Sequence, residues 1–233
     1  EIGLPEYRSV LAGSIFFLAL FASMVSVKAA PPNLPQTYID TTYSPPAGSL
    51  ITVNAGGNLQ AAINNAQPGD TIVLQAGAVF NGPIRLPSKV GSGWIYIRSS
   101  NYAGLPAPGN RVGPTDAANM PKIVVSPGGA SALNTQSGAH HYRLIGIEFR
   151  PAAGYFVNNL ISIGSSETTV AALPNNIFFD RCYIHGDPAV GGRRGIAMNG
   201  TAVAIIDSYV SDFKEIGADS QALWSGNSPG PLK

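Results

Sequence analysis

The sequence is poor in cysteine and in charge. Its 233 residues include one cysteine, Cys182, so no disulfide bond can form within the chain. Only 12% of the residues are charged and the formal net charge is +1, so no basic footprint for nucleic acid is present. The chain also lacks the H-E-x-x-H and phosphate-loop motifs and any Cys/His spacing typical of a metal site. Fold and function must therefore be inferred from other features.

Hydrophobic and turn-forming residues are abundant. Hydrophobic residues make up 45% of the chain, which is typical of an ordered protein, and the 27 glycines and 19 prolines favour many tight turns. The single cysteine occupies an apolar position of an expected strand, and we interpret it as a core residue rather than a nucleophile.

The most informative feature of the sequence is a unit that occurs twice. Residues 177–184 align with residues 203–210 at a shift of 26, and the same shift places residues 196–200 on residues 222–226. Each unit is too short to bury its own apolar face. It must therefore stack on its neighbours, as in a solenoid.

An earlier copy of the unit lies upstream. Residues 142–149 align with residues 177–184 at a shift of 35, and that shift also places residues 160–164 on residues 195–199. The nine additional residues indicate an insertion, which is most simply placed in the loop 165–175.

The pattern within each unit favours strands. Apolar residues alternate and are interrupted by a polar step at Asp180 and Arg181, which indicates two short strands joined by a corner. A third strand follows at 195–199. The sequence thus predicts an all-β fold, a right-handed parallel β-helix; a β-sandwich is the alternative. In the β-helix, two inward columns are expected, the first formed by Ile161, Ile196 and Ala222 and the second by Ile163, Met198 and Trp224.

The N-terminal region divides by composition. Residues 10–27 are almost continuously apolar, and small residues precede a possible cleavage after Ala29, so residues 1–29 are predicted to be a signal peptide or an uncleaved membrane anchor. Residues 30–49 form a Pro-rich linker, and residues 50–233 form the β-helix. The protein is therefore expected to be secreted, periplasmic or on the cell surface, and to touch a membrane only if residues 10–27 are retained.

The start of the predicted β-helix carries a short amphipathic helix, residues 58–66, with Asn58 as a candidate N-cap. Together with the segment Pro68-Gly69-Asp70-Thr71-Ile72 and with Gly82 and Ile84, this region resembles the opening of the pectate-lyase-like right-handed β-helix superfamily. The resemblance implies a capping α-helix and a fold that serves lyases, hydrolases, esterases, epimerases and non-catalytic surface proteins. It does not select a reaction.

Two further features concern the outside and the end of the coil. Residues 99–121 form a long loop, which either walls a groove or is a solvated excursion. No capping segment follows the last expected strand, and open strand edges are usually covered, so we expect further coils beyond Lys233.

The repeat gathers polar residues along one edge. The shift of 26 carries Arg193 onto Asp219, so these two residues are expected to be neighbours on adjacent coils. The candidate site is completed by residues of the adjoining turns and strands, namely His185, Asp187, Arg194, Asp212, Lys214, Glu215 and Gln221. A stacked salt bridge with solvated turn charges is the alternative interpretation.

Acids and bases in such a cluster suit an acidic polysaccharide. In a lyase, Asp212 and Asp219 would hold a calcium ion, Lys214 would be the base, and Arg193 or Arg194 would bind the uronate carboxylate. His185, Asp187 and Gln221 would contact the substrate. A glycoside hydrolase would instead use Asp212 and Asp219 as its two carboxylates. A non-catalytic, adhesive carbohydrate-binding protein needs only the scaffold and remains an alternative.

Overall fold

The computed structural model describes residues 37–233. The predicted signal peptide or anchor and the first residues of the Pro-rich segment lie outside the described residues. Within the described part, no helix is both long and apolar enough to cross a membrane.

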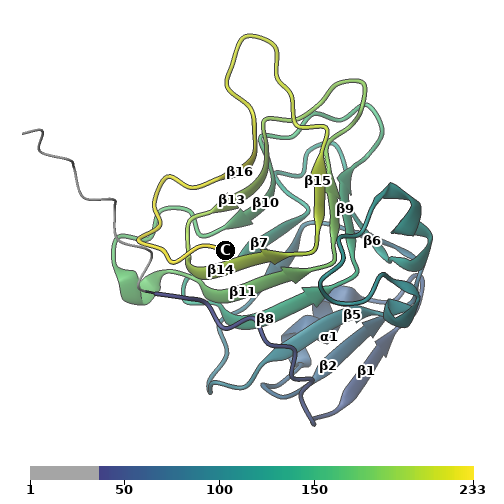
Figure 1. Ribbon diagram of the computed structural model, residues 1–233, viewed down its shortest axis with the longest axis vertical. Helices are drawn as coiled ribbons and strands as arrows, with labels where there is room; N and C mark the ends of the chain where they lie inside the picture. The colour runs from purple at the N-terminus through teal and green to yellow at the C-terminus, as the bar shows by residue number, and fades with distance from the viewer. Residues whose placement is uncertain (1–36) are drawn as a thin grey trace, which may run out of the picture. The chain divides into compact units, whose positions relative to one another are not determined.

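Within residues 37–233, sixteen strands form three parallel sheets, which we name A, B and C (Figure 1). Sheet A contains β1 (Leu50–Val53), β2 (Thr71–Leu74), β5 (Ile95–Ser99), β8 (His140–Ile145), β11 (Asn175–Asp180) and β14 (Thr201–Ile206). Sheet B contains β3 (Val79–Asn81), β6 (Lys122–Val125), β9 (Glu148–Pro151), β12 (Tyr183–His185) and β15 (Tyr209–Ser211). Sheet C contains β4 (Ile84–Leu86), β7 (Leu133–Thr135), β10 (Asn159–Ile163), β13 (Arg194–Met198) and β16 (Gln221–Trp224).

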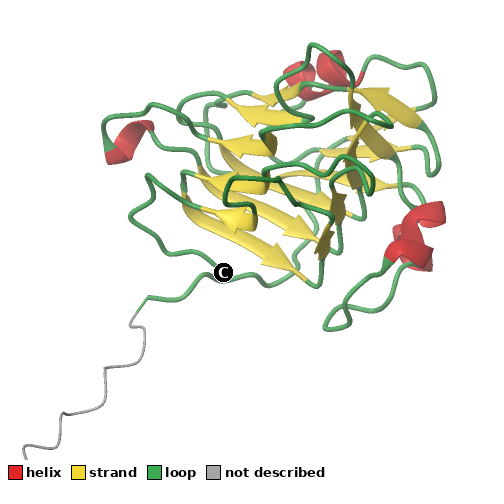
Figure 2. Cartoon of the chain, turned by 90° about the horizontal axis from the view of Figure 1, so that it is seen from above, coloured by secondary structure: helices red, strands yellow, loops and turns green. Residues whose placement is uncertain are grey.

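From β2 onward the chain visits the sheets in the repeating order A, B, C, and from β5 onward each strand pairs with its equivalent one coil earlier. Figure 2 shows the strands stacked in parallel layers, with the short helices at the edges. For example, Ile177 in β11 pairs with Tyr142 in β8 and with Val203 in β14. These pairings reproduce the shifts of 35 and 26 residues. The structure therefore confirms the predicted parallel β-helix.

A short corner joins sheets A and B, as the polar step in the sequence predicted. In the last two complete corners, Arg181 and Asp207 adopt positive φ angles of 49° and 48°. The Asp180 side chain lies at the end of β11, next to this corner. It does not satisfy the turn backbone but binds the guanidinium groups of Arg143 and Arg181, because burial at the strand end favours charged partners over a turn amide.

The core is a continuous column of apolar side chains. From β2 to β13 the inward apolar residues of the three sheets are buried, and the rings of Phe149 and Phe179 pack edge to face with centroids 5.8 Å apart. Each such side chain stabilises the fold by about 1.5–3 kcal/mol relative to exposure. Cys182 belongs to this core, as predicted, and burial raises the pKa of its thiol to about 12.

The predicted capping helix is present as α1 (Leu59–Asn65). The side chain of Asn58 accepts a hydrogen bond from the Ala61 amide at 2.9 Å, which confirms the N-cap. Leu59 and Ile63 are the buried residues of the helix and belong to the core, so α1 covers the open end of the first coil.

Three short 3₁₀ helices lie in loops, at Tyr102–Gly104, Pro114–Asn119 and Val170–Ala172. The first two belong to the long loop 99–121, which is folded against the coil. Its residues Leu105, Val112 and Met120 form a second apolar cluster, and Tyr183 and Tyr209 of sheet B pack against it. The third 3₁₀ helix lies in the predicted insertion, between β10 and β11.

The start of the compact unit differs from the boundary that composition suggested at residue 50. The unit begins at Thr37, and residues 37–49 contain no strand but contact sheet A. At the other end, Leu232 bridges Val203 of β14 in parallel, and the Lys233 amide donates to the Val203 carbonyl at 3.0 Å.

One register prediction was wrong. Ile161 pairs with Ile196 and Ile163 with Met198 as expected, but Ile196 pairs with Leu223 rather than Ala222, and Ala197 pairs with Trp224. The reason lies in the preceding loop, since eight residues separate His185 from Arg194 and nine separate Ser211 from Gln221. The extra residue changes the shift to 27 and exchanges the two faces of the last strand.

Candidate functional site

The predicted site residues lie where sheet B leads into sheet C, in the last two coils. Two loops stack there, residues 186–193 and residues 212–220, and the Gly192 amide donates to the Lys214 carbonyl at 3.1 Å. Gly191 has φ of 78°, and a Cβ atom there would overlap the Lys214 carbonyl oxygen. A glycine at this position is therefore required for the two loops to approach so closely.

Arg194 and Trp224 are brought together by the 27-residue register. The Arg194 guanidinium lies 4.1 Å from the centre of the Trp224 ring, and its Nη1 donates weakly to the Asn159 side chain at 3.5 Å. Trp224 was expected in the core. It instead aligns with Ala197, whose side chain lies outside the core cluster, so the indole is available to a cation on the outer face of sheet C.

Two buried polar atoms in this region have no hydrogen-bond partner among residues 37–233. They are Nε of Arg194 and Oε1 of Gln221, and the two residues are directly paired on β13 and β16. A buried donor or acceptor without a partner costs about 1–3 kcal/mol. These atoms are therefore candidate ligand contacts.

Arg193 does not pair with Asp219, which corrects the expectation from the repeat. Both Nε and Nη2 of Arg193 donate to the carboxylate of Glu215, the latter at 2.9 Å. This ion pair raises the pKa of the Arg193 guanidinium. The longer last loop shifts Asp219 out of register and brings the long side chain of Glu215 within reach instead.

Lys214 lies on the exposed turn predicted for it. Its Nζ atom donates to the Pro188 carbonyl at 2.8 Å, in the equivalent loop of the preceding coil. The amine is thus held on the same edge as Arg193 and Arg194.

Asp187 has a structural role that sequence reasoning missed. Its carboxylate accepts hydrogen bonds from the backbone amides of Val190, Gly154 and Ala189, which lower the pKa of the carboxyl group. The side chain therefore organises the loop 186–193, and its oxygens are engaged by the protein rather than presented to a substrate.

His185 joins a charged cluster on sheet B that was also missed. Its Nε2 lies 3.2 Å from the carboxylate of Glu148, and its ring stacks on that of Tyr183 at 4.2 Å. Glu148 is 5% exposed and also forms ion pairs with Lys122 at 3.0 Å and Arg150 at 3.4 Å. Only the strand register could have predicted this cluster, because it places Glu148 beside Tyr183 on the neighbouring strand.

Asp212 and Asp219, the two predicted calcium ligands, do not form a cluster with a further acidic side chain among residues 37–233. Asp212 accepts a hydrogen bond from Ser211 at 2.8 Å, and Asp219 is exposed. No group of three or more His, Cys, Asp or Glu side chains suited to a metal ion occurs between residues 37 and 233. Two carboxylates supply too few of the six to eight oxygens that calcium takes, so these residues by themselves do not fit the ion.

Comparisons with known proteins do not assign the chain to a family. No family model matches it, and no curated protein matches it. Among solved structures, an alginate lyase from Paenibacillus sp. strain FPU-7 is similar, with 21% identity and a TM-score of 0.46 over 70% of this chain and 44% of that one. An arginine-to-alanine mutant of AlyGC, an alginate lyase of the PL6 family, is similar with 17% identity and a TM-score of 0.34 over 77% of this chain and 22% of that one. This chain thus spans less than half the length of either protein.

Proposed function

We propose that this chain binds an acidic polysaccharide on the outer face of sheet C and cleaves it as a polysaccharide lyase outside the cytoplasm. The observation that carries the proposal is the pair Arg194 and Gln221, whose buried Nε and Oε1 atoms have no partner among residues 37–233, with the half-buried ring of Trp224 beside the Arg194 guanidinium. A uronate residue offers a carboxylate to the guanidinium, a hydroxyl group to the amide oxygen and a ring face to the indole.

The reaction would be an elimination next to the uronate carboxylate. Arg194 binds that carboxylate and stabilises the negative charge that develops on it when the neighbouring carbon loses its proton. Lys214 accepts the proton as the base. The electron pair of the broken C–H bond forms a carbon–carbon double bond, and the glycosidic oxygen leaves with its electrons and takes up a proton from water.

The geometry distinguishes between the two arginines. Arg193 is neutralised by Glu215, whereas Arg194 has no ion pair within residues 37–233. We therefore assign the carboxylate to Arg194. No step is routed through calcium, because Asp212 and Asp219 alone do not fit it.

A second candidate is binding without cleavage. Lys214 Nζ is already held by the Pro188 carbonyl, and Arg193 by Glu215, so both cations have structural partners. A glycoside hydrolase is the third candidate function. It would use Asp212 and Asp219, and both carboxylates would have to face the same glycosidic bond.

Incubation with pectate, alginate and a glycosaminoglycan tests these readings. A lyase produces unsaturated ends that absorb in the near ultraviolet and shortens the polymer on size-exclusion chromatography, whether or not calcium is chelated. New reducing ends without ultraviolet absorbance would indicate the hydrolase. Retention of a polymer on an affinity gel at unchanged chain length would replace the enzyme proposal with the adhesive one.

A further inference from the structure

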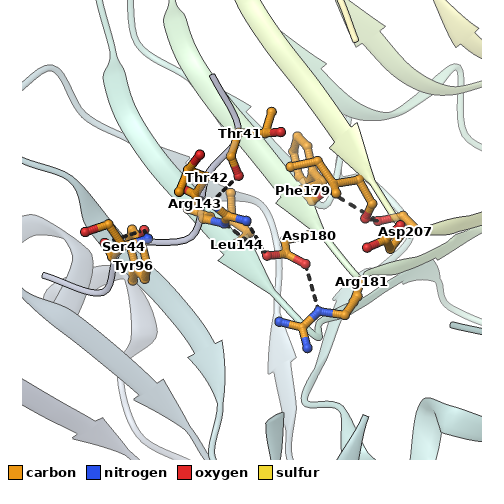
Figure 3. A network of polar contacts seen from close by, with 12 residues as sticks. Thr41, Thr42, Ser44, Tyr96, Arg143, Leu144, Phe179, Asp180, Arg181 and Asp207 are labelled. Atoms are coloured by element: carbon orange, nitrogen blue, oxygen red, sulfur yellow. Dashed lines mark hydrogen bonds and ion pairs between the residues drawn. The ribbon is translucent and has the colours of Figure 1, made fainter. Parts of the chain in front are cut away.

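The segment 37–49 lies across the outer face of sheet A, far along the chain from the residues that it contacts. Nη1 of Arg143 donates to the carbonyl groups of Thr41 and Thr42 at 3.1 and 3.0 Å (Figure 3). The Tyr96 hydroxyl donates to the Ser44 carbonyl at 2.7 Å. We call residues 37–49 the strap. It shields charged side chains of sheet A from water.

The shielded charges do not balance. Arg143 donates to one oxygen of Asp180 at 3.0 and 2.7 Å, and Arg181 donates to the other at 2.8 Å. All three side chains are buried, with exposed fractions of 4%, 4% and 2% for Arg143, Arg181 and Asp180. Two guanidinium groups thus share one carboxylate, which leaves one excess positive charge where desolvation is costly.

The other charged groups around this corner do not compensate. Asp207, on the next coil, accepts a hydrogen bond from the Gly109 amide at 2.6 Å, and it forms no ion pair with Arg181 within 4.0 Å. Arg98 lies 4.2 Å from the centre of the Tyr102 ring and adds a further cation. The potential at the corner is therefore positive.

A cavity of 270 Å³ opens at this corner, between the strap and the long loop 99–121. Its walls include Tyr43 of the strap, Tyr102 and Leu105 of the loop, and Arg181 of the corner. Two of the five N–H groups of Arg181 have acceptors in the described chain, the Asp180 carboxylate and the Pro106 carbonyl. The guanidinium can therefore offer further donors to an occupant.

From this arrangement we propose that the cavity binds a small molecule with one carboxylate and one ring. The carboxylate accepts hydrogen bonds from Arg181 and neutralises the excess charge, and the ring packs between Tyr43 and Tyr102. The volume lies just below the range of about 300–1,000 Å³ for drug-sized ligands, which limits the occupant to a single ring. The site lies on sheet A and is separate from the polymer site proposed on sheet C.

A sugar acid and an aromatic acid share this chemistry, so the test uses one of each. Titration of the full chain with D-glucuronate and with benzoate, followed by calorimetry and by the melting temperature, should show millimolar or tighter binding of at least one. D-glucose, which has the ring without the carboxylate, should not bind. Binding of glucuronate alone identifies a sugar-acid site, and binding of benzoate alone identifies an aromatic-acid site.

Variants locate the site. Tyr43→Ala should weaken binding at least tenfold, whereas Tyr38→Ala, on the same strap but 76% exposed and outside the cavity, should leave it unchanged. Arg181→Gln should abolish binding; if that variant does not fold, Tyr102→Ala takes its place with the same expectation.

Three outcomes would overturn the proposal. They are equal binding of glucose and glucuronate, absence of binding by both acids, and binding that Tyr43→Ala and Tyr102→Ala leave intact. If Arg194→Gln lost glucuronate binding and the variants of the cavity did not, the ligand would lie on sheet C, and the proposal would also be overturned.

Discussion

Arg143 and Asp180 form a buried ion pair on the outer face of sheet A, with Nε and Nη2 of the arginine 3.0 and 2.7 Å from one carboxylate oxygen. An outer face of a β-helix is ordinarily solvated, and this pair is dry because the strap crosses it. Residues 37–49, the described part of the segment that composition marked as a linker, thus pack against the coil.

The first prediction concerns this pair. Asp180→Asn should lower the free energy of unfolding by about 3–5 kcal/mol, because two guanidinium groups then remain buried without a counter-charge. Asp219→Asn, at an exposed aspartate, should change it by less than about 0.5 kcal/mol. Urea denaturation of the two variants measures the difference, and equal values would show that the pair contributes nothing.

The second prediction concerns the polymer site. Arg194→Lys should weaken binding to an acidic polysaccharide at least tenfold, because lysine has neither the planar stack on Trp224 nor the Nε donor. Arg85→Lys is the matched control, since Arg85 is exposed on the same sheet at its opposite end. Affinity electrophoresis in polymer-containing gels compares them. Equal retardation of both variants would remove Arg194 from the site.

The third prediction concerns the base. Lys214→Ala should abolish the ultraviolet signal of polymer cleavage and leave the melting temperature almost unchanged, because Lys214 is exposed and its contact with Pro188 lies on the surface. Lys89→Ala, which removes another lysine that donates to a backbone carbonyl, should leave cleavage unchanged. Cleavage by Lys214→Ala at the rate of the unmodified chain would exclude it as the base.

The fourth prediction concerns acid stability. Burial raises the pKa of Glu148, but hydrogen bonds from His185 and Lys122 and the charge of Lys122 outweigh burial, so the pKa lies below its usual range. A carboxyl group with a lowered folded-state pKa stabilises the fold above its unfolded-state pKa of about 4.3. That contribution is lost as the pH falls through the folded-state pKa.

Glu148→Gln should therefore destabilise the protein by about 1–3 kcal/mol near neutral pH. Its difference in unfolding free energy from the unmodified chain should stay level above about pH 5 and shrink as the pH falls from about 5 to about 3. Groups that do not contact Glu148 cancel in this comparison. A difference that stays constant across the range would show that Glu148 keeps its ordinary pKa.

The fifth prediction concerns Cys182. Because burial raises the pKa of this thiol to about 12, the thiolate that reacts with labelling reagents is scarce at about pH 8. A thiol reagent should label the native protein at least tenfold more slowly than the protein in denaturant. Equal rates would show that the last coils open readily.

The sequence predicted the coil because strand repeats must keep a common register. Ile161 and Ile196 share an inward column as their spacing implied, and Asn58 caps the helix that its position indicated. Local sequence spacing determines the inward column and the N-cap, because side chains alternate along a strand and a capping side chain binds an amide of the first helical turn. The prediction failed at Trp224 because one additional residue in the preceding loop exchanges the faces of β16, and the repeat alone does not reveal where a loop absorbs a residue.

Sequence alone thus determined the parallel strands, the inward apolar columns as far as β13 and the edge where Lys214, Arg193 and Arg194 lie. Only the tertiary structure determined which charged side chains pair with one another. Glu215 rather than Asp219 binds Arg193, and residues about a hundred positions upstream in the chain cover Arg143. The physical reason is that strand register depends on neighbouring residues, whereas charge pairing and burial depend on which segments meet in space.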